Sequence, residues 1–212
     1  MSKAAAQQLL DDPRLWRAGR RDLRWPVLSS GYPQLDAWLP GGGWPACRLT
    51  EIVVERWGSG ELALLMPLLA RLSAASVRQP GHWITWIAPP FLPYAPALAA
   101  AGIDPARVLL VRPGNEPETL WAAEQALRSG SCAIVLAWAD RVAGSSLRRL
   151  QLATEAGRTP LLLFRPPAVL STPSAASLRL RVAAGARGAS LHLHKHQGGA
   201  TTALPLDSLQ PR

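Results

Sequence analysis

The chain has 212 residues, of which 48% are apolar, so it suits one domain with a sizeable core. Arg, Pro or Gly interrupts every apolar run before it could span a membrane, and Asp11 and Asp12 stand where a signal peptide needs apolar residues, which predicts a cytoplasmic protein without membrane contact. The formal charge of +9 would suit a partner such as DNA, although an arginine-rich genomic composition explains it as well, because Lys3 and Lys195 are the only lysines.

The chain is expected to begin with an N-terminal extension over residues 1–27, including a short helix over residues 1–20. Three consecutive glycines at 41–43 predict a tight turn, because glycine adopts backbone angles that other residues avoid. The core domain is expected to cover residues 28–196.

From residue 49 onward, apolar runs alternate with segments that carry helix start and stop signals. Strands are predicted at 49–54, 83–88, 108–112, 132–138 and 160–164, and helices at 61–77, 92–101, 116–129 and 144–156. The strands are continuous apolar runs rather than alternating ones, which is the pattern that burial on both faces produces. We therefore predict an α/β domain with a mainly parallel sheet and helices on both of its faces.

The C-terminal part follows a different pattern. The segments "SLRLRVAAG" and "ASLHLHKHQ" alternate apolar and polar residues on either side of a glycine-containing turn. This alternation predicts an antiparallel hairpin with one solvent-facing side. Residues 197–212 contain few large apolar residues and are expected to form a flexible tail.

The stretch "EIVVERWGSGELALL" has the layout of a phosphate-binding turn, with an apolar strand, a glycine-containing loop and an apolar helix. The residues to compare with the pattern GxxxxGK[ST] are Glu55, Gly58, Gly60, Glu61 and Leu62. Glu61 stands in the place of the lysine that binds phosphate, and a unit charge about 4 Å away is worth about 4 kcal/mol at an effective dielectric of about 20, so attraction becomes repulsion. Leu62 replaces the hydroxyl residue and cannot ligate Mg²⁺, so we expect no nucleotide cofactor.

Longer segments resemble known proteins. The run "LSSGYPQLDAWLPGGGWPACRLTEIV" resembles the start of the core of RecA-type ATPases, and "LPGGGWP", "WIAPPFLPYAPALAAAGID", "LWAAEQALRSG" and "LRRLQLATEAG", in this order, are similar to the ImuA family. ImuA is a RecA-like accessory protein of bacterial mutagenic translesion synthesis, in the branch that also resembles the division inhibitor SulA. The resemblance covers about residues 28–182 and implies a RecA-like core with a mainly parallel sheet, flanking helices and a C-terminal antiparallel hairpin.

The resemblance also implies where catalytic groups would stand. RecA-type ATPases carry a carboxylate after the second core strand, where this chain has Ala88 followed by two prolines. Their Walker B strand ends in an aspartate, where this chain has Trp138, and Asp140 comes slightly late and is best interpreted as a turn residue or helix cap. With Glu61 at the lysine position, we expect no catalytic residue and no enzymatic activity.

Two groups of residues are candidates for contact with partners. Arg56 and Trp57 have the composition of a protein–protein hot spot, although Trp57 could instead fold over the vacant pocket. The polar side of the predicted hairpin carries Arg179, Arg181, His192, His194 and Lys195. This side is the best candidate for binding nucleic acid or an acidic partner, and a solvated basic edge that discourages aggregation is the alternative. The histidines lack a cysteine or nearby carboxylate to complete a site, so no metal is expected.

The resemblance to ImuA implies a non-catalytic, RecA-like adaptor in SOS-induced mutagenic translesion DNA synthesis. Its implied partners are RecA, an ImuB-type polymerase-like protein of the Y family and, indirectly, the error-prone replicative-type polymerase, with DNA contact more plausibly indirect. The alternative is a SulA-type division inhibitor that binds FtsZ, although the "LPGGGWP" segment and the basic C-terminal part favour ImuA. A DNA-dependent ATPase is a third hypothesis, against which the acid at Glu61 argues.

Overall fold

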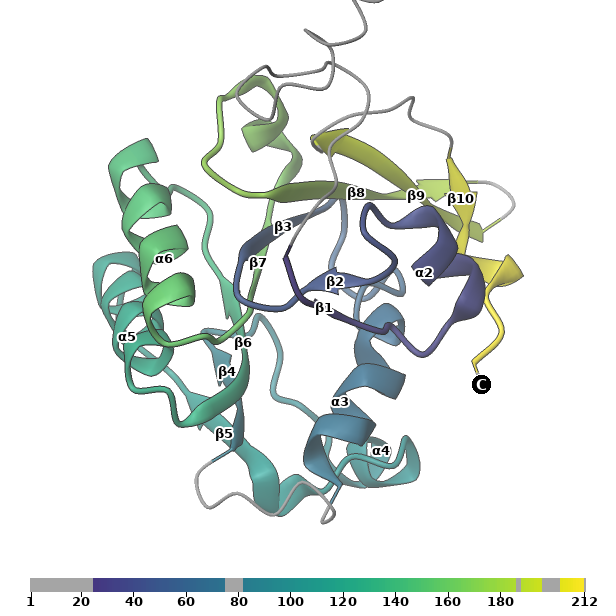
Figure 1. Ribbon diagram of the computed structural model, residues 1–212, viewed down its shortest axis with the longest axis horizontal. Coiled ribbons are helices and arrows are strands. Elements are labelled where there is room, and N and C mark those ends of the chain that lie inside the picture. Colours follow the sequence, from purple (N-terminus) through teal and green to yellow (C-terminus); the bar gives the residue numbers. More distant parts are fainter. Residues whose placement is uncertain (1–24, 75–81, 186–187, 196–202, 212) are drawn as a thin grey trace, which may run out of the picture.

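The computed structural model describes residues 25–74, 82–185, 188–195 and 203–211 (Figure 1). The predicted helix over residues 1–20 lies outside these ranges. Within them, no helix is both long enough and apolar enough to cross a membrane.

An eight-stranded sheet runs through the molecule in the order β10-β9-β8-β3-β7-β6-β4-β5 (Figure 1). Its strands are β3 (Leu49–Val54), β4 (Trp83–Ile87), β5 (Val108–Val111), β6 (Cys132–Trp138), β7 (Leu161–Arg165), β8 (Leu178–Gly185), β9 (Gly188–Lys195) and β10 (Leu204–Pro205). The pairs from β8 through β3, β7, β6 and β4 to β5 are parallel, whereas β8 pairs with β9, and β9 with β10, in antiparallel fashion. The apolar central strands β3 and β7 are buried along their whole length, as their composition predicts.

Helices cover both faces of this sheet (Figure 1). The helices α5 (Glu116–Arg128) and α6 (Gly144–Ala156) pack on one face, and α2 (Pro33–Trp38), α3 (Met66–Ser73) and α4 (Ala95–Ala100) pack on the other. Short 3₁₀ turns occur at η1 (Ala63–Leu65), η2 (Pro105–Arg107), η3 (Pro167–Ser171) and η4 (Leu206–Ser208). A small ladder of β1 (Val27–Leu28) and β2 (Trp44–Pro45) precedes the main sheet.

Local sequence signals set where several helices begin. The side chain of Asn115 accepts a hydrogen bond from the backbone N–H of Glu118, so it caps α5. Pro67 falls within the helix predicted over residues 61–77, of which residues 75–77 lie outside the described ranges, but it lies in the first turn of α3, after η1, where a missing N–H costs nothing. The predicted helix is therefore divided into a 3₁₀ turn and a shorter α-helix.

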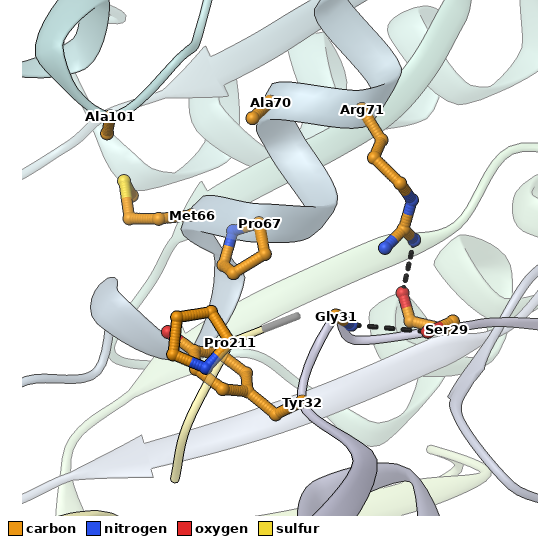
Figure 2. Close-up of a pocket in the computed structure, with 9 residues that line it drawn as sticks. All are labelled: Ser29, Gly31, Tyr32, Met66, Pro67, Ala70, Arg71, Ala101 and Pro211. Atoms are coloured by element: carbon orange, nitrogen blue, oxygen red, sulfur yellow. Dashed lines mark hydrogen bonds between the residues drawn. The ribbon is translucent and has the colours of Figure 1, made fainter.

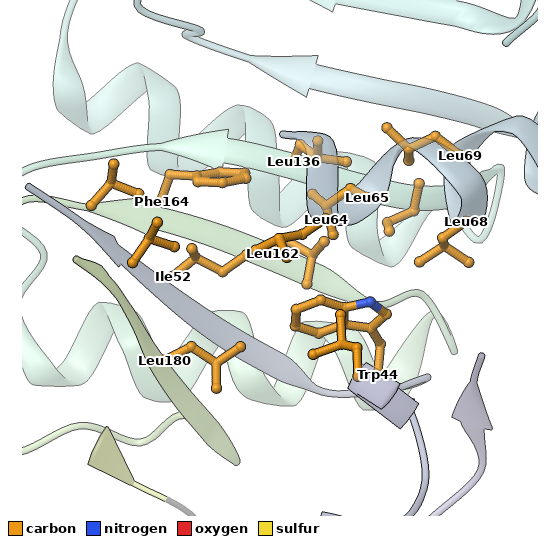
Figure 3. Packing of buried hydrophobic residues seen from close by; sticks show 14 of the residues in the cluster. Trp44, Ile52, Leu64, Leu65, Leu68, Leu69, Leu136, Leu162, Phe164 and Leu180 are labelled. Atoms are coloured by element: carbon orange, nitrogen blue, oxygen red, sulfur yellow. The ribbon is translucent and has the colours of Figure 1, made fainter. Parts of the chain in front are cut away.

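The larger core cluster fills the space between the sheet and helix α3 (Figure 3). Leu64, Leu65 and Leu68 project from η1 and α3 onto Ile52 and other side chains of the central strands. Aromatic rings extend this cluster across three strands, because Trp138 stacks on Phe164 with ring centroids 4.6 Å apart and contacts Trp86 at 5.6 Å. This row of rings ends at the edge of the sheet where the candidate site lies.

The prediction of a RecA-like core is wrong. The strands expected between residues 49 and 165 form, but they belong to a mixed eight-stranded sheet in which β8 lies parallel beside β3 and pairs with antiparallel β9, which in turn pairs with β10. An alternating strand–helix pattern is compatible with several sheets, because strand order depends on pairings between distant segments.

The C-terminal segment also differs from the flexible tail that was expected over residues 197–212. Within its described part, β10 pairs with β9, and Leu204, Leu206 and Leu209 pack against the larger core cluster. These leucines are too widely spaced to stand out as an apolar run, so their burial depends on the neighbouring sheet.

Candidate protein-binding site

The candidate site lies where β3, β4 and β6 end. Because these strands run in the same direction, their carboxyl ends share one edge of the sheet, the usual ligand-binding edge of parallel sheets. A cavity of about 400 Å³ opens there, between the loop after β3 and the segment after β4. It is lined by Gly58, Glu61, Leu62, Ala63, Met66, Trp86, Pro89, Pro90, Phe91, Leu92, Pro93, Tyr94, Ala97, Leu98 and Trp138. We call this cavity the strand-end pocket.

One wall of the strand-end pocket is the segment 89–94, "PPFLPY", which joins β4 to α4. Its side chains Phe91, Leu92 and Tyr94 are 69%, 71% and 71% exposed. Proline fixes the backbone angle φ and lacks an N–H, so the three prolines stiffen this segment without offering hydrogen-bond donors to water. A rigid, exposed group of large apolar side chains beside a pocket is typical of a protein-binding surface.

The chain enters this segment through a strained residue. Ala88 has a φ of 54°, in the left-handed region, which costs roughly 1–2 kcal/mol for a residue with a side chain. Strain of this kind persists only where the surrounding structure holds it, and it often marks functional sites. The turn at Ala88 directs the proline-rich segment across the edge of the sheet.

The opposite wall is the loop compared above with a phosphate-binding turn. Gly58 and Gly60 have φ values of 84° and 102°, so the loop needs glycine at both positions. The backbone N–H of Gly58 donates to Oε1 of Glu61 at 2.8 Å, and Glu61 is only 3% exposed. The protein's own carboxylate therefore occupies an N–H that an anion would otherwise take, while Leu62 and Glu55 supply no phosphate-binding group.

The two candidate contact residues in this loop, Arg56 and Trp57, differ in their exposure to solvent. Arg56 is exposed, whereas Trp57 is partly buried and packs against the larger core cluster. Trp57 also lines a second cavity of about 360 Å³, which shares Pro90 and Trp138 with the strand-end pocket and includes exposed Asp140. Its partial burial fits the alternative in which Trp57 folds back onto the protein better than the alternative of an exposed hot spot.

The predicted hairpin of β8 and β9 forms, but the prediction that Arg179 contacts a partner is wrong. This side chain is 3% exposed, and its Nε donates to Oε2 of Glu51 at 2.7 Å, while Arg165 Nη1 donates to Oε1 of the same carboxylate at 2.8 Å. Arg179 also donates to the backbone oxygens of Val169 and Thr172. The alternating pattern shows which residues share a side of β8 but not that η3 covers part of that side. Arg179 is therefore a buried structural residue and does not form a contact surface.

Arg181 on β8 and His194 on β9 carry less free charge than expected. Arg181 pairs with Glu55, whose pKa is lowered by that hydrogen bond, and Arg181 is also the register partner of His192. Burial lowers the pKa of His194, and the charges of Arg179, Arg181 and His192 lower it further, which disfavours its charged form. Lys195 ends β9. The geometry therefore supports an acidic partner here less well than the sequence does.

Sequence reasoning missed Glu51 and Arg165 as members of a buried ion cluster with Arg179. A signal was present, because each is a charged residue inside or at the end of an apolar run. Burial acts to raise the pKa of Glu51, but hydrogen bonds from Arg179, Ser174 and Arg165 outweigh it and lower the pKa. The cluster fixes the three strands β3, β7 and β8 to one another.

The lowered pKa predicts acid sensitivity. Since the folded pKa of Glu51 lies below its ordinary value of 4.5, its stabilisation is fully present above about pH 4.5 and is lost as the pH falls through the folded value. Urea unfolding of the wild type between pH 7 and pH 3 should show this loss. Asp36, Glu55 and Glu124, whose pKa values are also lowered, contribute with the same sign, so the Glu51 part is the difference between wild type and Glu51→Gln. Equal pH dependence of the two proteins would contradict this assignment.

A larger cavity of about 780 Å³ lies between the loop at Ser29–Tyr32, helix α3 and Pro211 (Figure 2). Its walls are mainly apolar, and among the described residues that line it Arg71 is the one with a charge. The Arg71 guanidinium donates to the backbone oxygen of Ser29, while Gly31 N–H donates to the Ser29 hydroxyl (Figure 2). These contacts hold the wall together, so this cavity offers no comparable group for a partner.

Comparisons with known proteins match the region that contains the strand-end pocket. A family model described as cell division inhibitor SulA matches residues 48–160, from the start of β3 to beyond α6, and so includes the pocket. The chain is 34% identical over 127 residues to the cell division inhibitor SulA of Edwardsiella piscicida, covering 58% of this chain and 76% of that protein.

Two further matches were found. The chain is 33% identical over 147 residues to Protein ImuA of Caulobacter vibrioides, covering 67% of this chain and 59% of that protein. The crystal structure of SulA from Pseudomonas aeruginosa is 28% identical, with a TM-score of 0.46, and the match covers 57% of this chain and 99% of that chain. The resemblance to ImuA is therefore confirmed as similarity within a SulA-like group. The match over residues 48–160 shows that this chain belongs to the SulA family.

Proposed function

We propose that the chain is a non-catalytic, protein-binding adaptor of the bacterial response to DNA damage, and that partners dock on the strand-end pocket. The observation that supports this function most directly is the exposed, proline-stiffened segment with Phe91, Leu92 and Tyr94 beside an apolar cavity. Large aromatic side chains around a desolvated pocket are the usual centre of protein interfaces. The loop after β3 fits this role, because Glu61 gives it an acid in place of a phosphate-binding lysine.

Its partners, by the similarity to ImuA, would be RecA and an ImuB-type polymerase-like protein in mutagenic translesion synthesis. The 33% identity to Protein ImuA supports this choice, and because the chain spans 59% of that relative's length, the activity of the whole relative is part of the proposal. Contact with DNA would pass through these partners, since Arg181 is paired with Glu55 on the hairpin face.

The partner-binding test uses Phe91→Ala with Tyr94→Ala. Truncating two central hot-spot side chains should weaken binding to the purified ImuB-type protein, or to RecA, by about 30-fold or more. Isothermal titration calorimetry measures this change directly. Trp121→Ala is the matched control, because Trp121 is an equally exposed aromatic residue (62%) on α5, away from the pocket, and should leave affinity unchanged. A loss caused by the control, with none from the double variant, would move the interface elsewhere.

A second candidate function is inhibition of cell division through FtsZ. The SulA family model over residues 48–160 and the 76% coverage of a SulA relative favour it. Overproduction that causes filamentation, with binding to purified FtsZ that the same double variant abolishes, would select this function. Binding to the ImuB-type protein without filamentation would select the adaptor.

A further inference from the structure

We propose that the strand-end pocket selects a basic side chain, lysine or arginine, presented by the partner protein. This inference rests on the proposed function, because it names the chemistry of the group that enters the same pocket. It extends the expectation that Glu61 makes this loop repel phosphate.

The buried carboxylate of Glu61 is the group that would bind this cation. Glu61 is 97% removed from solvent, and while its Oε1 accepts the Gly58 N–H at 2.8 Å, its Oε2 is buried without any hydrogen-bond partner. A buried carboxylate oxygen without a partner is costly, and a cation that binds it removes that cost. Among the described residues that line the pocket there is no lysine, arginine or histidine, so the wall itself supplies no counter-ion.

The rest of the pocket suits the remainder of such a side chain. Trp86, Trp138, Phe91 and Tyr94 present aromatic rings, which pack against an aliphatic stem and attract a cation over their faces. A volume of about 400 Å³ accommodates one long side chain. Trp86 Nε1 is also buried without a partner, but a neutral N–H is a weaker determinant than a full charge, so the carboxylate decides the sign of the ligand.

Access to the acid needs only a small motion. The terminal torsion of glutamate is broad and roughly two-fold, so a modest rotation about it, which moves both oxygens together and loosens the hydrogen bond from Gly58, brings the carboxylate toward the cavity. An anionic or neutral group of the same length gains nothing from this rotation. The pocket therefore discriminates by charge as well as by shape.

The direct test uses small probes with the full chain. We expect n-hexylammonium, which carries a lysine-like stem and cation, to bind about tenfold more tightly than n-hexanol, and hexanoate to bind most weakly. Titrations followed by the indole N–H signals of Trp86 and Trp138 in ¹H–¹⁵N spectra give the affinities and place the probe in the pocket. Equal affinities of the ammonium and the alcohol for the wild type would overturn the inference, and this comparison needs no variant.

Glu61→Gln keeps an oxygen to accept the Gly58 N–H and removes the charge. In this variant the preference for hexylammonium over hexanol should disappear. Glu155→Gln is the control with the same charge change, because Glu155 pairs with Arg48 beyond the amino-terminal end of β3, and it should keep the full preference. Retention of the preference in Glu61→Gln would also overturn the inference.

The same variants separate this inference from the proposed function. If Phe91→Ala with Tyr94→Ala abolishes partner binding but Glu61→Gln leaves it unchanged, the result supports the docking site and contradicts the selection of a basic side chain. If the double variant has no effect, the docking site itself falls, whatever the probes show.

Discussion

Replacing Glu51 with glutamine should lower the free energy of unfolding by about 3–5 kcal/mol. Glu51 is fully buried and accepts hydrogen bonds from Arg165 at 2.8 Å and from Arg179 at 2.7 Å, and both arginines are 3% exposed. Removing the one negative charge leaves two buried guanidinium groups without compensation. That loss is much larger than the net stabilisation that the cluster provides, because removing one member of a buried ion pair leaves the charge of its partners uncompensated.

Urea unfolding of the wild type and of Glu51→Gln measures this difference at pH 7. Glu55→Gln is the matched control, because Glu55 forms a partly exposed pair with Arg181, two residues after Arg179 on β8, and solvent-screened pairs of this kind contribute little to stability. Equal losses in the two variants would show that burial of the cluster does not set its energy.

Replacing Gly157 with alanine should destabilise the protein by about 3 kcal/mol. A Cβ atom at this position would lie 1.7 Å from the carbonyl oxygen of Leu127 and 2.8 Å from its carbon. Both atoms belong to the backbone at the end of α5, so no side-chain rotation relieves the clash. The ends of α5 and α6 would have to move apart. This movement would open the second core cluster, to which both helices contribute buried side chains such as Leu127 and Leu150.

Gly144→Ala provides the comparison within the same helix. A Cβ at Gly144 meets nothing within 4 Å, and alanine restricts the unfolded chain more than glycine, so this variant should be neutral or up to about 1 kcal/mol more stable. Thermal and urea unfolding of both variants test the contrast. A Gly157→Ala protein as stable as Gly144→Ala would contradict the close approach of the two helices.

At Gly157 the predicted end of the helix is correct, but the reason why glycine is needed there differs from the usual one. The sequence predicts a helix that ends there, and α6 ends at Ala156 with Gly157 as its cap. Its φ of −89° is open to any residue, so the left-handed conformation common at such caps does not require the glycine. The neighbouring backbone of α5 requires it, and only the packed structure reveals that contact.

The sequence by itself determined the local elements. Continuous apolar runs identified the strands, as at Leu49–Val54 and Cys132–Trp138, and helix start and stop signals gave α6 its full range, because these depend on burial pattern and backbone chemistry within a few residues. That Glu61 stands where a phosphate-binding loop would need a lysine was likewise readable from one position.

Only the tertiary structure decided which segments meet. The placement of β8 beside β3 overturned the RecA-like core, buried Arg179 against Glu51 and turned a predicted binding residue into a structural one. The strand-end pocket joins loops about 30 residues apart, so neither the partnerless oxygen of Glu61 nor its aromatic surroundings has a local signature. Pairing between distant strands creates these contacts, and its energy depends on neighbours that the local sequence does not specify.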